Sequence, residues 1–353
     1  MDRRAILNAL QRVSRSRHRF QLVVPTDQPL PVTHSVLSTQ ALCTEMVAAY
    51  GLRTPLDCKL LSPGLNDTYL VTTAADRFIL RIYRVGWRSH SDILYEIDVL
   101  NHLGRKGASV SLPLATAKGD FTLPLRAPEG LRYAVLFTYA PGQSVDELDD
   151  SYCRLFGGAV GEMHRATGDF TSQHERFALD LEYLIERPLR AIRPLLENRS
   201  EDWSHLQSLA QRLQAALAQA PLDVLDWGFC HGDLHTENAH LAGDTLTFFD
   251  FDCGGPGWRA YDIAGFRWSL NNFGRRVVPE HEHLWQAFLD GYAERRRIGT
   301  VDLEFVPAFV EIRHIWMIGL HAENAPDFGY ERFSDSYFDG VLRFLRDWEQ
   351  TYL

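Results

Sequence analysis

The sequence predicts an α+β protein with two lobes, in which a smaller strand-rich lobe precedes a larger helical lobe. Residues 56–142 contain short β-type apolar runs that Pro and Gly interrupt. From about residue 150 onward, apolar residues recur at helical spacing instead. The length of 353 residues exceeds what one hydrophobic core usually holds, so two lobes are expected.

The strand-rich lobe is expected to begin with a β-hairpin. Two β-type runs in residues 56–73 are separated by Pro63-Gly64 and Asn66-Asp67, which are turn-forming pairs. Ser91 is expected to cap the helix that comes later in this lobe, and Gly104 or Gly107 to end it. The pattern predicts a third strand, this helix and a last apolar strand at residues 77–85, 91–107 and 132–142.

The remaining elements define three expected regions of the chain. A capped helix over residues 38–50, which Gly51 closes, precedes the sheet. We expect an N-terminal extension with this helix at 1–52, a strand-rich N-lobe at 53–142 and a helical C-lobe at 143–353. In the C-lobe, helices are expected at 150–167, 200–220, 280–297, 303–322 and 335–350, with one β-type run at 245–252.

The composition is that of a globular enzyme, with 45% hydrophobic and 23% charged residues. The formal charge of −10 disfavours a nucleic-acid binder, and no apolar run is long enough to span a membrane. Five scattered cysteines favour reduced thiols and a cytoplasmic location. The basic residues within 1–36 leave two interpretations open, a solvated extension or an anion-binding arm. The oligomeric state is not indicated.

The residues that indicate chemistry lie between Phe229 and Asp252. Asp233 follows His231-Gly232, Asn238 comes five residues after Asp233, and Asp250 comes twelve residues after Asn238. Phosphoryl transfer needs a carboxylate that orients or deprotonates the attacking hydroxyl, together with oxygen ligands for Mg²⁺. Asp233 suits the first role, while Asn238 and Asp250 suit the second, because hard oxygen donors are the ligands that Mg²⁺ prefers.

This spacing resembles the catalytic loop of protein kinases, H-R-D-x-x-x-x-N. Gly232 replaces the Arg, and Asp250-Phe251-Asp252 stands where Asp-Phe-Gly would be. With these two departures, the chain from about residue 55 onward resembles the kinase-like phosphotransferases. That family includes aminoglycoside phosphotransferases, choline kinases, type II homoserine kinases and a bacterial stress-response kinase. The resemblance implies a bilobal protein-kinase-like fold, ATP and Mg²⁺ as cofactors, and a hydroxyl-bearing acceptor.

The resemblance also assigns supporting roles around this motif. It implies that His231 orients the backbone. Asp262 is expected to hold the catalytic loop in place, with a capping role in the core as the alternative. Asp252 lies on the same strand face as Asp250 and is its rival as a metal ligand, although the family register favours Asp250. Asp327-Phe328-Gly329 also spells D-F-G, but it follows no predicted strand and is interpreted as a turn.

The nucleotide side is expected in the strand-rich lobe. Arg81 is a single cation within an apolar strand, and Glu96 is its expected partner on the following helix. In the family, this cation pairs with the nucleotide phosphates. Ser62 and Asn66 are candidates for hydrogen bonds to phosphate, although a plain hairpin turn explains this segment equally well.

The segment 135–142 is expected to link the lobes and to meet the adenine edge. Phe137 and Tyr139 bracket the backbone that would make this contact, and a simple buried strand is the alternative. The C-terminal helices are expected to form the acceptor site. Their aromatic side chains suit choline, while Arg267 and Arg313 suit a substrate carboxylate such as that of homoserine. Aminoglycosides, a protein Ser/Thr substrate and a nucleotide-binding pseudokinase remain alternatives.

Overall fold

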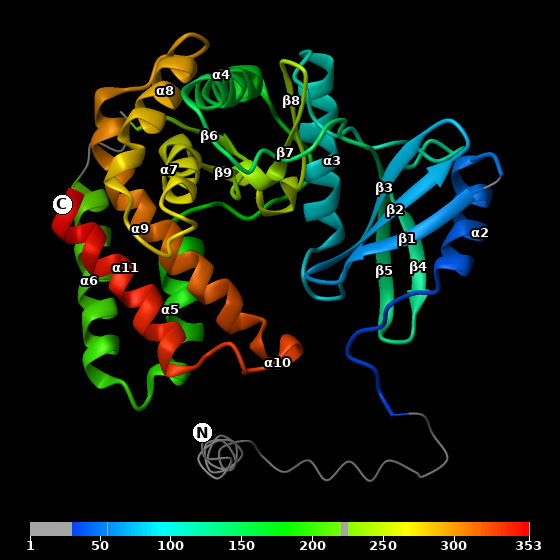
Figure 1. The fold of residues 1–353 in the computed structure, drawn as a ribbon. Helices are drawn as coiled ribbons and strands as arrows, with labels where there is room; N and C mark the ends of the chain where they lie inside the picture. The colour runs from blue at the N-terminus through cyan, green and yellow to red at the C-terminus, as the bar shows by residue number, and fades with distance from the viewer. Residues whose placement is uncertain (1–29, 55, 220–224, 353) are drawn as a thin grey trace. The chain divides into compact units, whose positions relative to one another are not determined.

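The computed structural model describes residues 30–54, 56–219 and 225–352. Most of the N-terminal extension, residues 1–29, lies outside this range, so neither interpretation of its basic residues is tested. Residues 34–353 form one compact unit. Within it an antiparallel sheet of order β1-β2-β3-β5-β4 precedes a helical part (Figure 1). The strands of this sheet are β1 (Leu56–Ser62), β2 (Asn66–Thr73), β3 (Arg77–Tyr83), β4 (Leu123–Ala127) and β5 (Gly130–Thr138).

The two faces of this sheet pack against different helices. Leu80 and Ile82 of β3 belong to a core cluster that also contains the buried side chains of α2 (Thr39–Tyr50). Tyr83, on the alternate face, belongs to the larger core that contains the buried side chains of α3 (His90–Arg105). Because strand side chains alternate between faces, Arg81 shares the face of Tyr83 and is directed toward α3.

The helix ends confirm one predicted cap and correct another. Ser38 caps α2, and Gly51 ends it at φ +64°, as expected. Helix α3 is capped by Ser89 rather than by Ser91. Ser89 Oγ accepts from the Asp92 amide at 3.1 Å, and the Asp92 carboxylate accepts from the Ser89 amide at 2.9 Å. This reciprocal capping box satisfies two donors at once, which Ser91 cannot do from inside the first turn.

The first hairpin is tighter than the sequence predicts. Its turn uses the residues from Pro63 to Leu65, whereas Asn66 and Asp67 already belong to β2. Asp67 is fully buried and pairs with Arg132 of β5 at 2.7 Å. Strand β4, which the sequence analysis did not identify, lies at the sheet edge and contains Pro124, a residue that edge strands tolerate.

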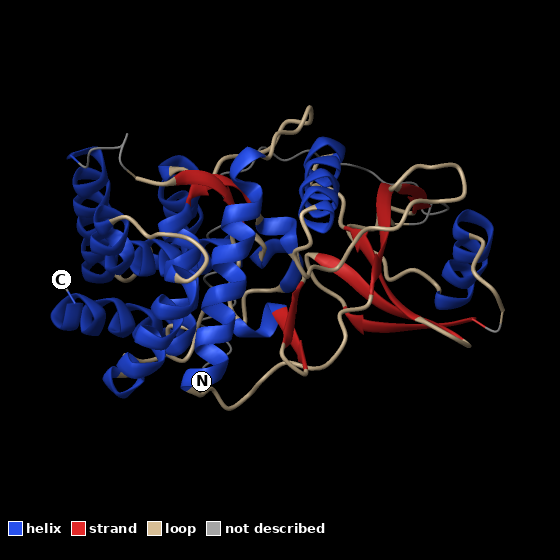
Figure 2. Cartoon of the chain, turned by 90° about the horizontal axis from the view of Figure 1, so that it is seen from above, coloured by secondary structure: helices blue, strands red, loops and turns tan. Residues whose placement is uncertain are grey.

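The helical part contains short strands on either side of the residues singled out between Phe229 and Asp252. Strand β6 (Trp227–Cys230) pairs with β9 (Gly255–Trp258), and β7 (Ala239–Ala242) pairs with β8 (Thr245–Phe248). Figure 2 shows most of the helices gathered on one side of the five-stranded sheet. No helix within the described residues is long and apolar enough to cross a membrane. The helices are α4 (Asp150–Ala166), α5 (Arg187–Ile192), α6 (Ser200–Gln219), α7 (Arg259–Leu270), α8 (Glu282–Ala293), α9 (Thr300–Glu323), α10 (Ala325–Phe328) and α11 (Asp335–Tyr352).

Helix α9 contains a buried acidic side chain, Glu311. It is fully buried, and among the described residues neither of its carboxyl oxygens has a hydrogen-bond partner. Burial, together with the nearby charge of Glu349, raises the pKa of Glu311 from 4.5 to about 8. Glu311 is therefore protonated in the folded protein at neutral pH.

Glu311 should make stability fall with rising pH. Below about pH 4.5 the carboxyl is protonated in both the folded and unfolded chains, so its contribution is fully present there. Between this pH and about pH 8 the carboxyl of Glu311 ionises only in the unfolded chain. This ionisation lowers the free energy of unfolding by about 1.4 kcal/mol per pH unit. Glu311→Gln should therefore melt progressively higher than wild type from pH 5 to pH 8. Exposed Glu304 on the same helix provides the control, since Glu304→Gln should follow wild type. A constant difference between Glu311→Gln and wild type across this range would contradict the prediction.

Candidate active site

The β6–β7 loop, residues 231–238, and the end of β8 bring the three motif residues together. Asp233 follows β6, Asn238 ends a short 3₁₀ turn immediately before β7, and Asp250 follows β8. Because β7 and β8 form a hairpin, the residue before β7 and the residues after β8 lie side by side. The Phe249 amide donates to the Asn238 backbone carbonyl at 3.1 Å, which fixes this junction.

The β6–β7 loop is anchored by one buried carboxylate. Asp262 of α7 accepts from the amides of His231 and Gly232 at 2.6 and 2.8 Å. Its Oδ2 also lies 3.0 Å from Nε2 of buried His164. Burial opposes ionisation of Asp262, but the hydrogen bond and charge of His164 hold its pKa below the ordinary value. The expectation that Asp262 holds the catalytic loop is confirmed.

Gly232 is required at its position by both backbone and packing. Its φ of +79° lies in the left-handed region, which favours glycine. A Cβ on this residue would lie 2.1 Å from the backbone oxygen of Cys253, which follows the Asp250-Phe251-Asp252 segment. The close approach of these two backbone segments therefore excludes a side chain where protein kinases have Arg.

Asp233 is held by a cation from a distant helix. The guanidinium of Arg313, on α9, contacts Asp233 Oδ1, and His235 Nε2 lies 3.5 Å from the same oxygen. Burial opposes ionisation of Asp233, but the charges of Arg313 and His235 hold the pKa of this carboxyl well below its ordinary value. The Asp233 side chain is 25% exposed, so the ionised carboxylate remains accessible. This contact with Arg313 joins residues eighty positions apart and has no local sign in the sequence.

Asn238 and Asp250 present oxygen atoms that suit a divalent cation. The amide nitrogen of Asn238 donates to the Asp233 backbone carbonyl at 2.9 Å, which leaves the amide oxygen for a ligand. Asp250 has φ +68°, and its side chain is 44% exposed. No group of three or more His, Cys, Asp or Glu side chains forms a metal cage in the described part of the chain. Two protein oxygens would leave positions for phosphate oxygens and water, an arrangement typical of Mg²⁺.

Asp252, unlike Asp250, accepts hydrogen bonds from several side chains of the sheet and of the segment before α3. Its Oδ2 accepts from Asn66 at 2.5 Å and from the Trp87 indole at 2.8 Å. Its backbone oxygen accepts from Arg88 and Arg176 at 2.7 and 2.6 Å. These contacts connect the end of β8 to the sheet and to the residues that precede α3. Asp252 is also buried, whereas the Asp250 side chain is partly exposed, and this difference favours Asp250 over Asp252 as a metal ligand.

The expected ion pair between β3 and α3 is present. Arg81 Nη1 donates to Glu96 Oε1 at 2.7 Å, and the Tyr83 hydroxyl donates to Glu96 Oε2 at 2.7 Å. Arg81 Nη2 donates in addition to Asp250 Oδ1 at 2.8 Å, a contact that the sequence analysis did not predict. Arg81 therefore connects the sheet to the motif in the helical part.

A cavity of about 260 Å³ adjoins this ion pair. Its lining includes Arg81, Glu96, Asp250, Phe137 and Tyr139, so five of the predicted site residues meet there. Ser62 and Asn66 are not among the lining residues. Ser62 is exposed at the end of β1, and the amide nitrogen of Asn66 is committed to Asp252, as described above. From this hairpin, the residues that line the cavity are Leu61 and Thr68.

The histidines of the motif contact the chain itself. His231 Nε2 lies 3.0 Å from the Phe249 backbone oxygen, in agreement with an orienting role. His240 Nδ1 lies 2.9 Å from the Ala140 backbone oxygen. In the alternative D-F-G sequence, Asp327 and Phe328 are the last two residues of the short helix α10 and Gly329 follows it, so the segment is the end of a helix rather than the expected turn. Its Asp327 lies 3.6 Å from Arg84, which follows β3, and the ring of Phe328 lies 4.7 Å from the Arg84 guanidinium carbon.

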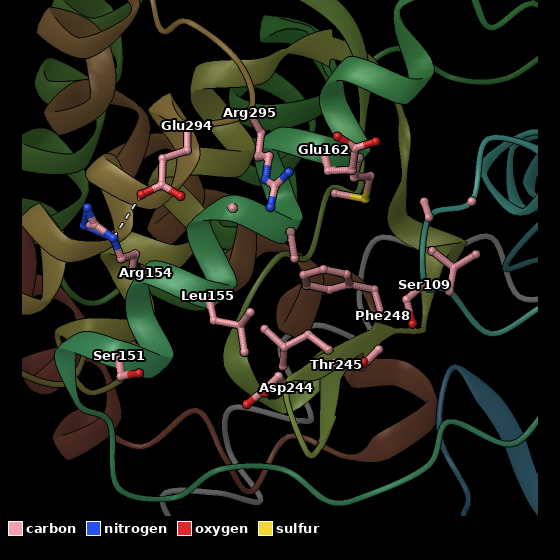
Figure 3. Close-up of a pocket in the computed structure, with 17 residues that line it drawn as sticks. Ser109, Ser151, Arg154, Leu155, Glu162, Asp244, Thr245, Phe248, Glu294 and Arg295 are labelled. Carbon is pink, nitrogen blue, oxygen red and sulfur yellow. Dashed lines mark hydrogen bonds and ion pairs between the residues drawn. The ribbon is translucent and has the colours of Figure 1, made fainter.

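A larger cavity, of about 490 Å³, lies away from these residues (Figure 3). It is lined by the segment after α3, by α4, by the β7–β8 turn and by the end of α8. Arg154 and Glu294 pair across its edge at 3.0 Å. None of the predicted site residues lines this cavity.

Comparison with known proteins identifies similar chains. Residues 57–298 match the model of the phosphotransferase enzyme family. An uncharacterised protein of Deinococcus radiodurans is 41% identical over 324 residues, which cover 91% of this chain and 93% of that protein. Amicoumacin kinase of Bacillus subtilis is 26% identical over 294 residues, which cover 81% of this chain and 85% of that protein. A solved amicoumacin kinase, in complex with AMP-PNP, Ca²⁺ and its ligand, aligns with a TM-score of 0.73 at 22% identity, covering 89% of this chain and 94% of that one.

Replacement of Gly232 should destabilise the protein more than a matched glycine replacement. Gly243 also has a positive φ, of +59°, but a Cβ there would meet no atom within 4 Å. Gly243→Ala should cost about 1–2 kcal/mol, the backbone term alone. Gly232→Ala adds the overlap with the Cys253 oxygen and should give the lower melting temperature. Equal melting temperatures for the two variants would contradict the prediction, because they would show that the loop at Gly232 can move to accommodate a Cβ.

Proposed function

Because the chain belongs to the phosphotransferase enzyme family, we propose that it transfers the γ-phosphate of ATP to a hydroxyl group of a small molecule, with Mg²⁺ as its metal. The single observation that supports this most is the meeting of Asp233, Asn238 and Asp250 where the β6–β9 strand pair adjoins the β7–β8 hairpin. The ~260 Å³ cavity adjoins them, and Asp250 lines it. This arrangement provides a carboxylate for the acceptor and oxygen donors for a metal beside a space for the nucleotide.

We place the nucleotide in the cavity lined by Phe137 and Tyr139. Its apolar walls suit a purine, and the backbone of Tyr139, between Phe137 and Ala140, would meet the adenine edge. Arg81 provides a fixed cation for the phosphates. Glu96 holds this cation in place, because an unpaired buried guanidinium would be costly.

Asn238 and Asp250 would hold the metal through their side-chain oxygens. When bound, Mg²⁺ would neutralise charge on the transferring phosphate. Asp250 is also the residue that Arg81 contacts, so the metal ligand and the phosphate-binding cation are adjacent. The position of Asp250 thus depends on the sheet as well as on the β7–β8 hairpin.

Asp233 would accept a hydrogen bond from the acceptor hydroxyl and orient its oxygen toward the γ-phosphorus. As the new O–P bond forms and the bond to the leaving phosphate breaks, the hydroxyl proton passes to Asp233. The lowered pKa of this carboxyl keeps it ionised and ready to accept the hydrogen bond at neutral pH. Its main contribution under these conditions is orientation.

Two ion pairs argue against one of the acceptor alternatives, a substrate with a carboxylate. Arg313 is engaged by Asp233, and Arg267 is engaged by Glu282. Both arginines considered for a substrate carboxylate are thus paired with carboxylates of the chain, which weakens the homoserine-type alternative. We propose that the acceptor binds beside Asp233 through its hydroxyl group and its apolar surface rather than through a carboxylate.

An ADP-release assay over a panel of acceptors tests this function. The panel contains homoserine, choline, ethanolamine, sugars, aminoglycosides and a generic protein. We expect turnover with a small alcohol that lacks a carboxylate. Preferential transfer to the protein would favour a Ser/Thr protein kinase, and ATP binding without turnover on any acceptor would favour a pseudokinase.

Asp233→Asn should lower kcat by ~10²–10⁴ while nearly preserving the affinity for ATP. The amide keeps the size of the side chain but removes the charge that orients the hydroxyl. Steady-state ADP release and equilibrium nucleotide titration measure the two quantities separately. Turnover near the wild-type value would show that Asp233 does not act on the acceptor.

Asp250→Ala should abolish the gain in nucleotide affinity that Mg²⁺ provides. Asp252→Asn is the matched control, because its carboxylate already accepts two hydrogen bonds and should retain Mg²⁺ dependence. Nucleotide titrations with and without Mg²⁺ decide between the two residues. The reverse pattern, with Mg²⁺ dependence lost only in Asp252→Asn, would transfer the ligand role to Asp252.

A further inference from the structure

Arg313 is a buried cation that lies against the catalytic motif. Its side chain is 4% exposed and projects from the middle of α9, eighty residues after Asp233. Nη1 donates to the Gly232 backbone oxygen at 3.0 Å, and Nη2 contacts Asp233 Oδ1. One guanidinium therefore holds both the backbone and the side chain at the centre of the β6–β7 loop.

Two tryptophans fix the orientation of this guanidinium. The Trp268 and Trp316 ring centroids lie 5.1 and 4.7 Å from the Arg313 guanidinium carbon, which is within the range of cation–π attraction. The Trp268 indole donates to His314 Nδ1 at 3.1 Å, so its ring is fixed in turn. Arg313 is thus held by α7 and α9 before any acceptor arrives.

The contact distinguishes the two oxygens of Asp233. Arg313 engages Oδ1, whereas the nearest recorded donor to Oδ2 among the described residues is the Asn238 amide nitrogen at 3.4 Å. A carboxylate held at one oxygen has its rotation restricted, so the other oxygen presents a fixed direction. In the proposed reaction, that direction determines how the acceptor hydroxyl is aligned.

We propose that Arg313 is a positioning residue that holds Asp233 through Oδ1 and thereby directs Oδ2 at the acceptor hydroxyl. This inference depends on the proposed function, because it assumes that Asp233 acts on the acceptor. It differs from a purely structural role, in which Arg313 would only neutralise a buried charge and support the packing of α7 against α9.

A double-mutant cycle separates the two roles. The variants are Arg313→Met, Asp233→Asn and the combined change, with Arg313→Lys as the conservative variant. Arg267→Met is the matched control: Arg267 is also buried among aromatic rings, but it pairs with Glu282. The measurements are kcat and the ATP KM for ADP release with the best acceptor, ATP hydrolysis with water as the acceptor, and the melting temperature.

If Arg313 acts through Asp233, Arg313→Met lowers kcat by about 10–100-fold and changes the ATP KM by less than about threefold. In the Asp233→Asn background the same change causes no further loss, because the residue that it positions is already inactive. Arg313→Lys recovers part of kcat, and Arg267→Met stays within a few-fold of wild type.

Other results would overturn the inference. An equal loss of kcat from Arg313→Met in both backgrounds shows that Arg313 acts independently of Asp233. Wild-type kcat in Arg313→Met also overturns it. Should the Met variant fail to fold, wild-type kcat in Arg313→Gln, which removes the charge, overturns it instead. The proposed function fails separately, if Asp233→Asn retains wild-type turnover in both the acceptor and the water assays.

Discussion

The site depends on the contact between the Asp262 carboxylate and two consecutive backbone amides. The amides of His231 and Gly232 lie in a buried turn, where an unsatisfied donor costs about 1–3 kcal/mol. One carboxylate satisfies both donors, and His164 stabilises its ionised form. This anchored turn determines three features of the site: the left-handed backbone at Gly232, the close approach of the Cys253 oxygen, and the direction in which the chain leaves toward Asp233.

Two buried arginines pair with the carboxylates of the site. Arg313 lies against Asp233, and Arg81 lies between Glu96 and Asp250. Buried charges without such partners would be expensive, so the pairs make an acidic site compatible with a folded core. The two cations come from different parts of the fold, Arg81 from the sheet and Arg313 from α9. The electrostatics of the site therefore require both parts to be in place.

Much of this arrangement was predictable, because it depends on local sequence. Short spacings along the chain indicated Asp233, Asn238 and Asp250, and the pairing of Arg81 with Glu96 followed from one cation in an apolar strand. Contacts between distant segments were not predictable in the same way. Nothing in the sequence near Arg313 shows that it meets Asp233 rather than a substrate carboxylate. The local sequence around Asn66 similarly indicated a turn, because its hydrogen-bond partner Asp252 lies 186 residues away and leaves no local sign.

The contact of Arg84 with α10 has a consequence for the movement of the lobes. Arg84 follows the last residue of β3, whereas Asp327 and Phe328 come after α9, the helix that carries Arg313. Any hinge motion that widens the space between the sheet and the helical part must separate this guanidinium from both the carboxylate and the ring. A segment far from the motif residues thus links the two parts of the fold, and in the proposed reaction its contacts would have to break whenever the lobes separate to release a nucleotide.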